Sequence, residues 1–186
     1  CEDMFLLSNV RILELRYAPS FLLDAHPAMD ADRMLEAILR GMARAEAAYP
    51  MVVGLIGLLQ RIKSVEDNAF WCDWILERKA HFVGMDLADD EVSYPASPFA
   101  PLFQKAKAQG LGITVHAGEP NVPGAAKNIL VALDELGADR IGHGVQAIHD
   151  AEAVARLAKD GVPLELCPWS NVLTRAVPDL KSHPFK

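Results

Sequence analysis

The sequence predicts an α/β fold, a (β/α)8 TIM barrel of which these residues form an incomplete part. Apolar runs bounded by turn residues alternate with longer amphipathic segments, a pattern typical of βαβ units and a parallel sheet. Successive runs lie about 30 residues apart, which leaves room for a crossover helix. Polar residues recur at the carboxyl ends of several runs, as they do where barrel strands line a shared cavity.

The apolar runs predict six strands, and amphipathic segments between them predict five helices. The strands are expected at 11–19, 51–59, 81–88, 112–118, 140–144 and 162–168. The helices are expected at 30–48, 65–79, 98–109, 124–136 and 150–160, and the chain also opens within an amphipathic helical pattern. The 30–48 helix has one apolar stripe, formed by Met34, Leu35, Ile38, Leu39 and Met42. One face of this helix is therefore expected to pack while the other meets water.

Turn residues mark several of these boundaries. Ser97 followed by Pro98 predicts a helix N-cap with proline in the first turn. Gly110, Gly137 and Gly161 stand where helices end and where a residue that tolerates positive φ is favoured.

Two architectures fit the alternation of strands and helices. A doubly wound sheet would place a glycine-rich phosphate turn after the first strand, and "RYAPSF" is not such a turn. The spread of polar strand ends favours the barrel instead. A closed barrel has eight strands, so we expect residues 1–186 to form a single partial barrel domain that lacks two of them.

Composition limits the class of protein further. The chain has 186 residues, of which 51% are hydrophobic, and a mean hydropathy of +0.12, as expected for a globular fold. No apolar run approaches the roughly 20 residues that span a bilayer, so no membrane association is predicted. The net charge is −7 without a basic stripe, so nucleic acid is not an expected partner. Cys1, Cys72 and Cys167 are scattered and odd in number, which favours a reducing, cytoplasmic setting.

The stretch "GITVHAGEPN" carries the first candidate functional residues. His116 ends a predicted strand, Gly118 permits a bend, and Glu119 follows. A zinc site with an open coordination position needs about three protein ligands and a nearby carboxylate to handle a proton. The alternative is a packed structural histidine followed by an exposed loop acid at a helix start, and the two residues alone do not decide between these readings.

The segment "RIGHG" places His143 between two glycines at the end of the next strand. The flanking glycines permit either a tight turn or close approach of the backbone to a ligand. His143 is therefore either a capping residue of that turn or a partner of His116 in acting on a water molecule. Both readings stay open at this point.

Other polar strand ends are more ambiguous. Asp86, Asp89, Asp90 and Glu91 follow the 81–88 strand, either as a solvated loop or as a site for a metal or polar ligand. Cys167 in "CPWSN" is expected to be buried and inert, since no adjacent base would activate it as a nucleophile. The four remaining histidines, at 26, 81, 149 and 183, are expected on the surface.

Five motifs together resemble the adenosine deaminase family of zinc-dependent purine deaminases. In chain order they are "ELRYAPS", "GMDLADDE", "VHAGE", "RIGHG" and "CPWSN", and the resemblance runs through essentially the whole chain. Each motif is weak alone, but five in register on successive strands are specific. The resemblance implies a (β/α)8 barrel of the metal-dependent hydrolase type, of which this segment would supply about strands 2 to 7.

The resemblance also implies roles for individual residues. His116 matches a zinc ligand, Glu119 the proton donor to purine N1, and His143 the histidine that orients the attacking water. The implied cofactor is Zn²⁺ and the implied partner is a small-molecule purine nucleoside. Zinc would activate water for attack on C6, and protonation of N1 would make that carbon more electrophilic before ammonia leaves. The oligomeric state is not predicted.

Two departures from the family pattern stand out. The family's paired histidines on strand 1 and consecutive aspartates on strand 8 do not occur here, so residues 1–186 alone are not expected to complete the zinc site. The family motif "DLAGDE" has a glycine that contacts the purine, and Asp89 occupies that position as the substrate-binding candidate. Its side chain would either crowd the ring or turn outward.

The expected reaction is deamination of adenosine or 2′-deoxyadenosine to inosine or 2′-deoxyinosine. Two alternatives remain: a deaminase of another 6-aminopurine, such as adenine, AMP or aminofutalosine, and a non-catalytic purine-binding barrel. A phosphorylated substrate would favour basic residues at the barrel mouth, where Arg16 and Lys127 are the visible candidates.

Overall fold

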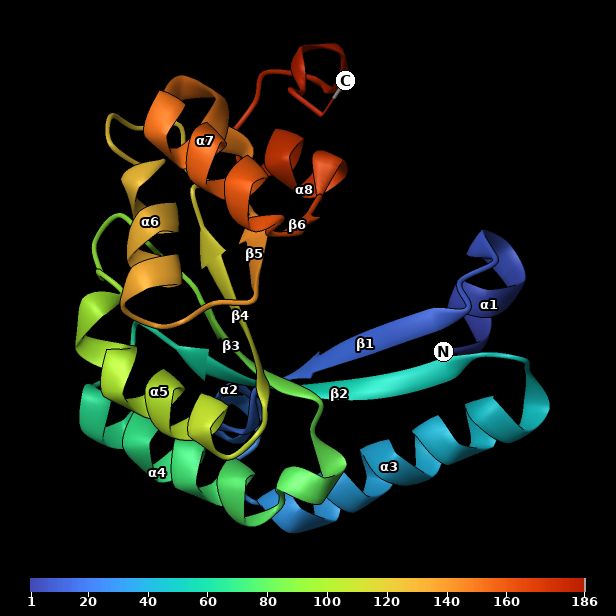
Figure 1. Cartoon of the computed structure of the whole chain (residues 1–186). Coiled ribbons are helices and arrows are strands. Elements are labelled where there is room, and N and C mark those ends of the chain that lie inside the picture. The colour runs from blue at the N-terminus through green and yellow to red at the C-terminus, as the bar shows by residue number, and fades with distance from the viewer. Residues whose placement is uncertain (186) are drawn as a thin grey trace.

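The computed structural model describes residues 1–185 and confirms the predicted α/β fold as an incomplete barrel. Within these residues, six parallel strands form one sheet in the order β1-β2-β3-β4-β5-β6. The strands are β1 (Ile12–Tyr17), β2 (Val52–Gln60), β3 (Gly84–Ala88), β4 (Gly112–Ala117), β5 (Arg140–His143) and β6 (Leu164–Glu165). Figure 1 shows the sheet turning through an arc, with β1 and β6 at its two edges.

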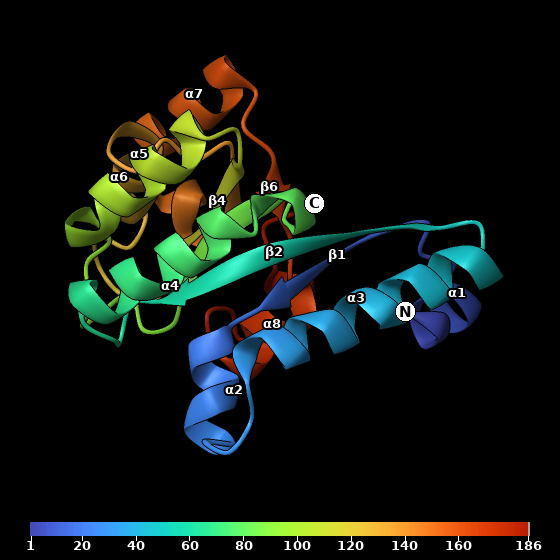
Figure 2. The same cartoon turned by 90° about the horizontal axis from the view of Figure 1, so that it is seen from below.

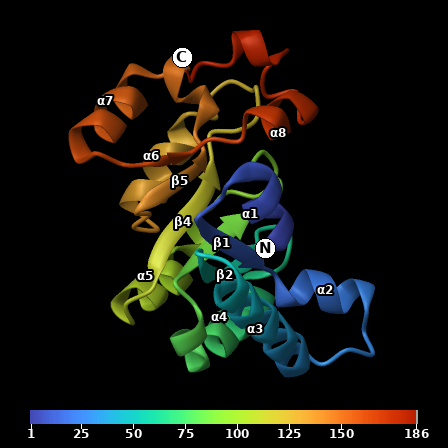
Figure 3. The ribbon, with the colours of Figure 1, turned by 90° about the vertical axis from the view of Figure 1, so that its right-hand side faces the viewer.

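Helices connect the strands and cover the outer side of the arc. The α-helices of the described residues are α1 (Glu2–Ser8), α2 (Pro19–Ala25), α3 (Ala31–Ala48), α4 (Val65–Glu77), α5 (Ala100–Ala108), α6 (Lys127–Asp134), α7 (Ala151–Asp160) and α8 (Pro168–Leu173). Short 3-10 helices are η1 (Lys79–His81), η2 (Ser97–Phe99), η3 (Val145–His149) and η4 (Leu180–Ser182). In Figure 2, α3 runs alongside the long strands β1 and β2, and α4 to α7 follow round the sheet. Figure 3 shows α8 and the C-terminal residues gathered above the strands, away from α3 and α4.

The side chains of β4 alternate between the outer and the inner face of the sheet. Ile113, Val115 and Ala117 are buried in the main hydrophobic core, which extends into the covering helices. Thr114 and His116 point the other way, because successive side chains of a strand alternate between faces. Their polar contacts, with Glu165 and Asp86, lie on the inner face of the sheet. The outer face therefore holds the fold together, and the inner face carries polar chemistry.

Ion pairs cross the inner face from β1 to β5 and β6. Arg140 lies 2.6 Å from Glu14 and 2.9 Å from Glu165, measured between nitrogen and carboxylate oxygen. Arg16 of β1 also pairs with Glu165. Barrel interiors are usually filled by branched apolar side chains. Here charged groups bridge the two ends of the open sheet instead.

The structure corrects the predicted elements at several ends. The 162–168 strand is reduced to Leu164–Glu165, because Pro168 begins α8 and Cys167 is its N-cap residue. The short helices α2 and α8 were not predicted. Ser97 is not a side-chain cap, since it is the first residue of η2 and accepts no capping bond. Gly110, Gly137 and Gly161 do adopt positive φ, at 91°, 69° and 63°.

The helices of the described region are too short or too polar to cross a bilayer: none combines the required length with sufficient apolar content.

Candidate active site

The end of β4 and the turn after it present two of the candidate residues. His116 is the penultimate residue of β4, and Glu119 follows the turn at Gly118. Gly118 has φ +68°, and a Cβ there would lie 2.7 Å from Cδ1 of the fully buried Ile129. Only glycine fits this turn without strain and without displacing the core. The backbone of the HAGE segment, residues 116–119, therefore requires glycine at position 118.

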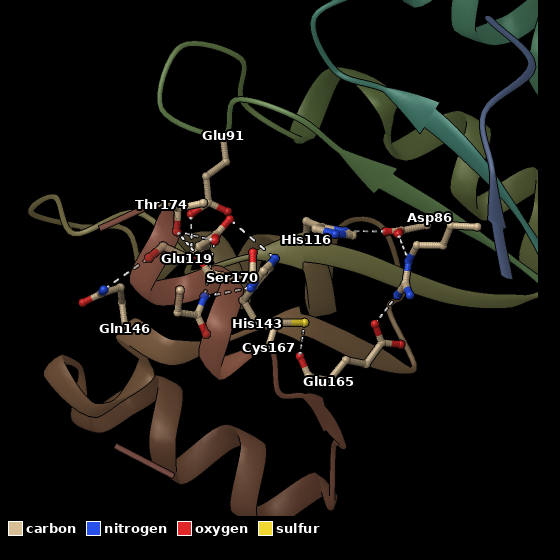
Figure 4. Close-up of polar contacts among 12 residues, drawn as sticks. Asp86, Glu91, His116, Glu119, His143, Gln146, Glu165, Cys167, Ser170 and Thr174 are labelled. Atoms are coloured by element: carbon tan, nitrogen blue, oxygen red, sulfur yellow. Dashed lines mark hydrogen bonds and ion pairs between the residues drawn. The ribbon is translucent and has the colours of Figure 1, made fainter. Parts of the chain in front are cut away.

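The structure brings His116, Glu119 and His143 together at neighbouring strand ends. β4 and β5 pair in parallel with Ala117 beside His143, so both strands end at the same level. The rings of His116 and His143 have centroids 5.1 Å apart. Nε2 of His143 lies 3.5 Å from Oε2 of Glu119. Figure 4 shows the three side chains facing a common space.

A buried carboxylate orients His116. Asp86 of β3 is fully buried, and its Oδ1 lies 3.0 Å from Nδ1 of His116. Its Oδ2 accepts a 2.6 Å hydrogen bond from Nε of Arg16. Burial by itself would raise the pKa of Asp86, but His116 and Arg16 outweigh burial and hold the pKa below its usual value. With Nδ1 bound to a carboxylate, Nε2 of His116 is the nitrogen left for a ligand.

His143 ends β5 in a left-handed backbone conformation, with φ 66°. Such a conformation is uncommon outside glycine, and it turns the ring toward Glu119. Nδ1 of His143 lies 2.9 Å from Nδ2 of the buried Asn171. Burial, assisted by the neighbouring His116, lowers the pKa of His143 against the opposing effect of Glu119. The ring is therefore neutral at neutral pH.

Hydrogen bonds from three sides fix Glu119. Its Oε1 accepts a 2.8 Å bond from Oγ1 of Thr174 and a 3.3 Å bond from Nδ2 of Asn171. Its backbone N–H donates to Oε1 of Glu91 at 3.1 Å. Oε2 is left directed toward His143. The carboxylate is thus held in place while one oxygen faces the proposed reaction space.

The acidic residues in and just after β3 divide into two buried and two exposed side chains. Asp86 and Glu91 are buried and contact His116 and Glu119 respectively, while Asp89 and Asp90 are exposed. Asp90 accepts bonds from the backbone of residues 92 and 93, so it stabilises the local turn. The segment is neither a uniformly solvated loop nor a metal cluster.

Two buried charged residues support the HAGE segment from behind. Arg61 donates a 2.6 Å hydrogen bond to the carbonyl oxygen of His116. Burial raises the pKa of Glu91 to about 7, although Arg61 and the backbone N–H groups of Gly118 and Glu119 oppose this shift. The turn that separates His116 from Glu119 is therefore anchored on both sides.

Asp89 lies beside these residues. It helps to line a cavity of about 260 Å³ together with His116 and Glu119. Its backbone has φ 82°, the left-handed conformation that favours glycine, at the position where the resembling motif has glycine. Its Oδ2 accepts a 3.1 Å bond from Nε2 of Gln60. The side chain is exposed, and its role in substrate binding stays a prediction.

Two other expectations need correction. Cys167 is half-buried rather than buried, and burial raises the pKa of its thiol, so it remains protonated and unreactive at neutral pH. His183 is buried rather than on the surface; its ring meets that of Phe185 edge to face and bonds to Asn171. Asn171 and Thr174 contact Glu119 but were not predicted as site residues. The only signal for them was the polar ending of "CPWSN" beside the α8 segment.

The donor groups present fit a zinc ion only in part. His116 fits one ligand position, since a carboxylate holds Nδ1 and the side chain is 25% exposed toward the cavity. Among residues 1–185, however, no group of three His, Cys, Asp or Glu side chains is placed to hold a metal ion. The described residues thus provide one candidate ligand and the acid–base groups around it, which is less than the three ligands zinc needs.

Comparisons with known proteins identify the family of the chain. The family model described as adenosine deaminase matches residues 3–186. An adenosine deaminase from Shewanella loihica is 35% identical over 180 residues, which cover 97% of this chain and 53% of the relative. The chain therefore spans about half the length of the curated relatives it matches.

Solved structures place the fold in the same group. An adenine deaminase from Arthrobacter aurescens superposes with a TM-score of 0.89 at 32% identity, covering 98% of this chain and 54% of that one. An amidohydrolase from Burkholderia ambifaria, solved with bound Zn, superposes with a TM-score of 0.82 at 26% identity, covering 91% and 46%.

Proposed function

This chain belongs to the adenosine deaminase family, and from that premise we propose that the complete protein deaminates adenosine or 2′-deoxyadenosine hydrolytically, with zinc as cofactor. The products would be inosine or 2′-deoxyinosine and ammonia. The observation that carries the proposal is the convergence of His116, Glu119 and His143 at the ends of β4 and β5. These groups can bind a metal, transfer a proton and orient water, which are the three tasks of the reaction.

His116 is the proposed zinc ligand, and Asp86 would hold its ring in the binding orientation. Zinc, when bound, supplies Lewis-acid activation of the attacking water. Further ligands would come from segments outside residues 1–186, in keeping with the greater length of the matched relatives.

Glu119 is the proposed proton donor to purine N1. Thr174 and Asn171 bind its Oε1, so Oε2 is the oxygen available to carry a proton to the substrate. Protonation of N1 draws electron density from C6 and favours attack there. His143 would bind and orient the attacking water, because its ring lies between Glu119 and the proposed zinc ligand.

The environment of Arg16 favours an unphosphorylated substrate. This guanidinium, which was one of two basic candidates for a phosphate, is already paired with Asp86 and with Glu165. Lys127, the other candidate, is an exposed side chain at the start of α6. A phosphate would have to compete with two carboxylates for Arg16. We therefore place adenosine ahead of AMP, and propose a small purine as the partner in a cytoplasmic setting.

The test is to measure ammonia release by the complete, zinc-loaded protein from adenosine, adenine and AMP in parallel. The proposal predicts the highest kcat/KM for adenosine or 2′-deoxyadenosine. A preference for adenine or AMP would reassign the substrate within the family. Failure of the complete protein to take up zinc, together with no turnover, would instead support a non-catalytic purine-binding barrel.

A further inference from the structure

A continuous chain of hydrogen bonds leads from the C-terminal segment to the proposed active site. It begins at the backbone N–H of Phe185, which donates to Nδ1 of His183 at 3.3 Å. Nε2 of His183 lies 3.0 Å from Oδ1 of Asn171, and Nδ2 of Asn171 lies 2.9 Å from Nδ1 of His143. His183, Asn171 and His143 are all buried, so water does not compete for these bonds.

The orientation of the Asn171 amide can be decided from its neighbours. One end of this amide faces both Nδ1 of His143 and, at 3.3 Å, Oε1 of Glu119. Oε1 of Glu119 already accepts a hydrogen bond from Oγ1 of Thr174, so an amide oxygen at that end would face another acceptor without a proton between them. The NH2 group must therefore point toward Glu119 and His143. The amide oxygen then points toward His183.

His183 is consistent with this orientation. Its Nδ1 accepts from the backbone of Phe185, so the ring proton of neutral His183 is on Nε2. That proton is donated to Oδ1 of Asn171. Each donor in the chain consequently meets an acceptor, and reversing the amide would break the contact at both of its ends.

The orientation of the Asn171 amide determines the tautomer of His143. A nitrogen that accepts a hydrogen bond from an amide has no proton of its own, so Nδ1 of neutral His143 is unprotonated. The ring proton is then on Nε2, the nitrogen 3.5 Å from Oε2 of Glu119. In this form His143 offers an N–H donor to the space between Glu119 and His116.

We infer that Asn171, itself held by His183, fixes the ring proton of His143 on Nε2 and is a positioning residue of the site. The effect on deamination rests on the proposed function, whereas the tautomer does not. Asn171 does not need to touch the substrate. It acts through His143, and His183 acts through Asn171.

The decisive variant is Asn171→Asp, which keeps the size of the side chain but replaces the amide donor with an acceptor. The ring proton of His143 should then move to Nδ1, because only a protonated Nδ1 can pair with a carboxylate oxygen. Proton–nitrogen correlation spectra of the imidazoles in the substrate-free, complete protein report which nitrogen carries the proton. We expect kcat to fall by about 10-fold or more, with KM changed far less.

Asn68→Asp is the matched control, since Asn68 is another buried amide whose bonds go to the backbone near β2 and α4. It should lose stability but leave the His143 tautomer unchanged. If His143 keeps its proton on Nε2 in Asn171→Asp, the inference is wrong. A correct tautomer shift in a protein without deaminase activity would instead contradict only the proposed function.

A second pair of variants covers the case in which Asn171→Asp does not fold. His183→Gln retains an amide N–H that can donate to Asn171, whereas His183→Leu does not. We expect the glutamine variant to preserve the His143 tautomer and most of kcat, and the leucine variant to lose both. Equal behaviour of the two variants in the imidazole spectra would overturn the role of His183.

Discussion

At the scale of single residues, Asp86 has the strongest influence on the proposed metal ligand. Its two oxygens serve different partners, with Oδ1 at His116 and Oδ2 at Arg16. Both partners are donors, and the carboxylate is fully buried. A buried carboxylate with two donors is well satisfied, and it leaves His116 only one nitrogen with which to bind a ligand.

Asp86→Asn should weaken zinc binding by the complete protein about 10- to 100-fold. An amide has one acceptor oxygen, so its NH2 group must oppose either Arg16 or Nδ1 of His116. Competition with a chelator measures the affinity. Asp90→Asn, an exposed acid in the same segment, is the control and should bind zinc like the wild type. Equal affinity for Asp86→Asn and the control would show that Asp86 does not orient the ligand.

Glu91 is expected to make stability depend on pH. Its pKa is raised from 4.5 to about 7 by burial, so the folded state binds this proton more tightly than the unfolded state does. Stability is therefore lost as pH rises from the unfolded to the folded pKa. Glu91→Gln removes this dependence. Relative to wild type, the variant should gain up to about 3 kcal/mol in unfolding free energy between pH 5 and pH 8.

Denaturant unfolding at the two pH values measures this difference. Glu66→Gln, on the exposed side of α4, should follow the wild-type pH dependence. Parallel curves for wild type and Glu91→Gln would mean that Glu91 is already ionised at pH 5.

Sequence reasoning located the candidate reactive residues better than the side chains that hold them. His116, Glu119 and His143 lie in short motifs at strand ends, where spacing alone suggests a shared cavity. Asn171 and Thr174 come from a segment 52 and 55 residues beyond Glu119, and a helix that was not predicted brings them back. These contacts depend on the path that the chain takes after β6. The local sequence pattern does not predict that path.

At the scale of elements, the turn between β4 and α6 places the proposed ligand and proton donor on either side of Gly118. Gly118→Ala should cost about 1–2 kcal/mol for the left-handed backbone, and more because its Cβ would meet Ile129. Gly124→Ala is the matched control, since Gly124 also has positive φ, at 84°, but nothing within 4 Å of the added Cβ.

We expect Gly118→Ala to lower both the unfolding midpoint and kcat, and Gly124→Ala to lower only the midpoint, by less. Thermal unfolding and steady-state kinetics provide the two measurements. An equal loss of stability in both variants with kcat intact would mean that the turn tolerates a side chain.

Most elements were predictable because the spacing of apolar residues and the turn residues at the ends of each segment indicated the same boundaries. The helices α3 and α7 have N-caps that bond to the first turn, and all six strand predictions contain the observed strand or differ from it by a single residue. The exceptions follow proline. Pro19 and Pro168 each open a short helix after a strand, with one or two residues between them, and seven or six residues are too few to show a helical period.

At the scale of the whole molecule, the sheet is open and its inner face is charged. Arg16, Arg140, Glu14 and Glu165 connect β1 with β5 and β6, so the two ends of the arc are held by ion pairs in place of a closed barrel. The matched relatives are about twice as long. In a complete protein, further segments would supply the remaining ligands beside His116 and bring the proposed chemistry into one enclosed site.

The proposed role of Glu119 is tested most directly by ammonia release from adenosine by the complete, zinc-loaded protein, compared between wild type and Glu119→Gln. We expect kcat to fall by about 10²- to 10⁴-fold, because the amide cannot deliver a proton to N1, with zinc content unchanged. Glu152→Gln, on the exposed first turn of α7, should retain wild-type activity. Undiminished ammonia release from Glu119→Gln would contradict the assignment of Glu119 as the proton donor, and with it the proposed site.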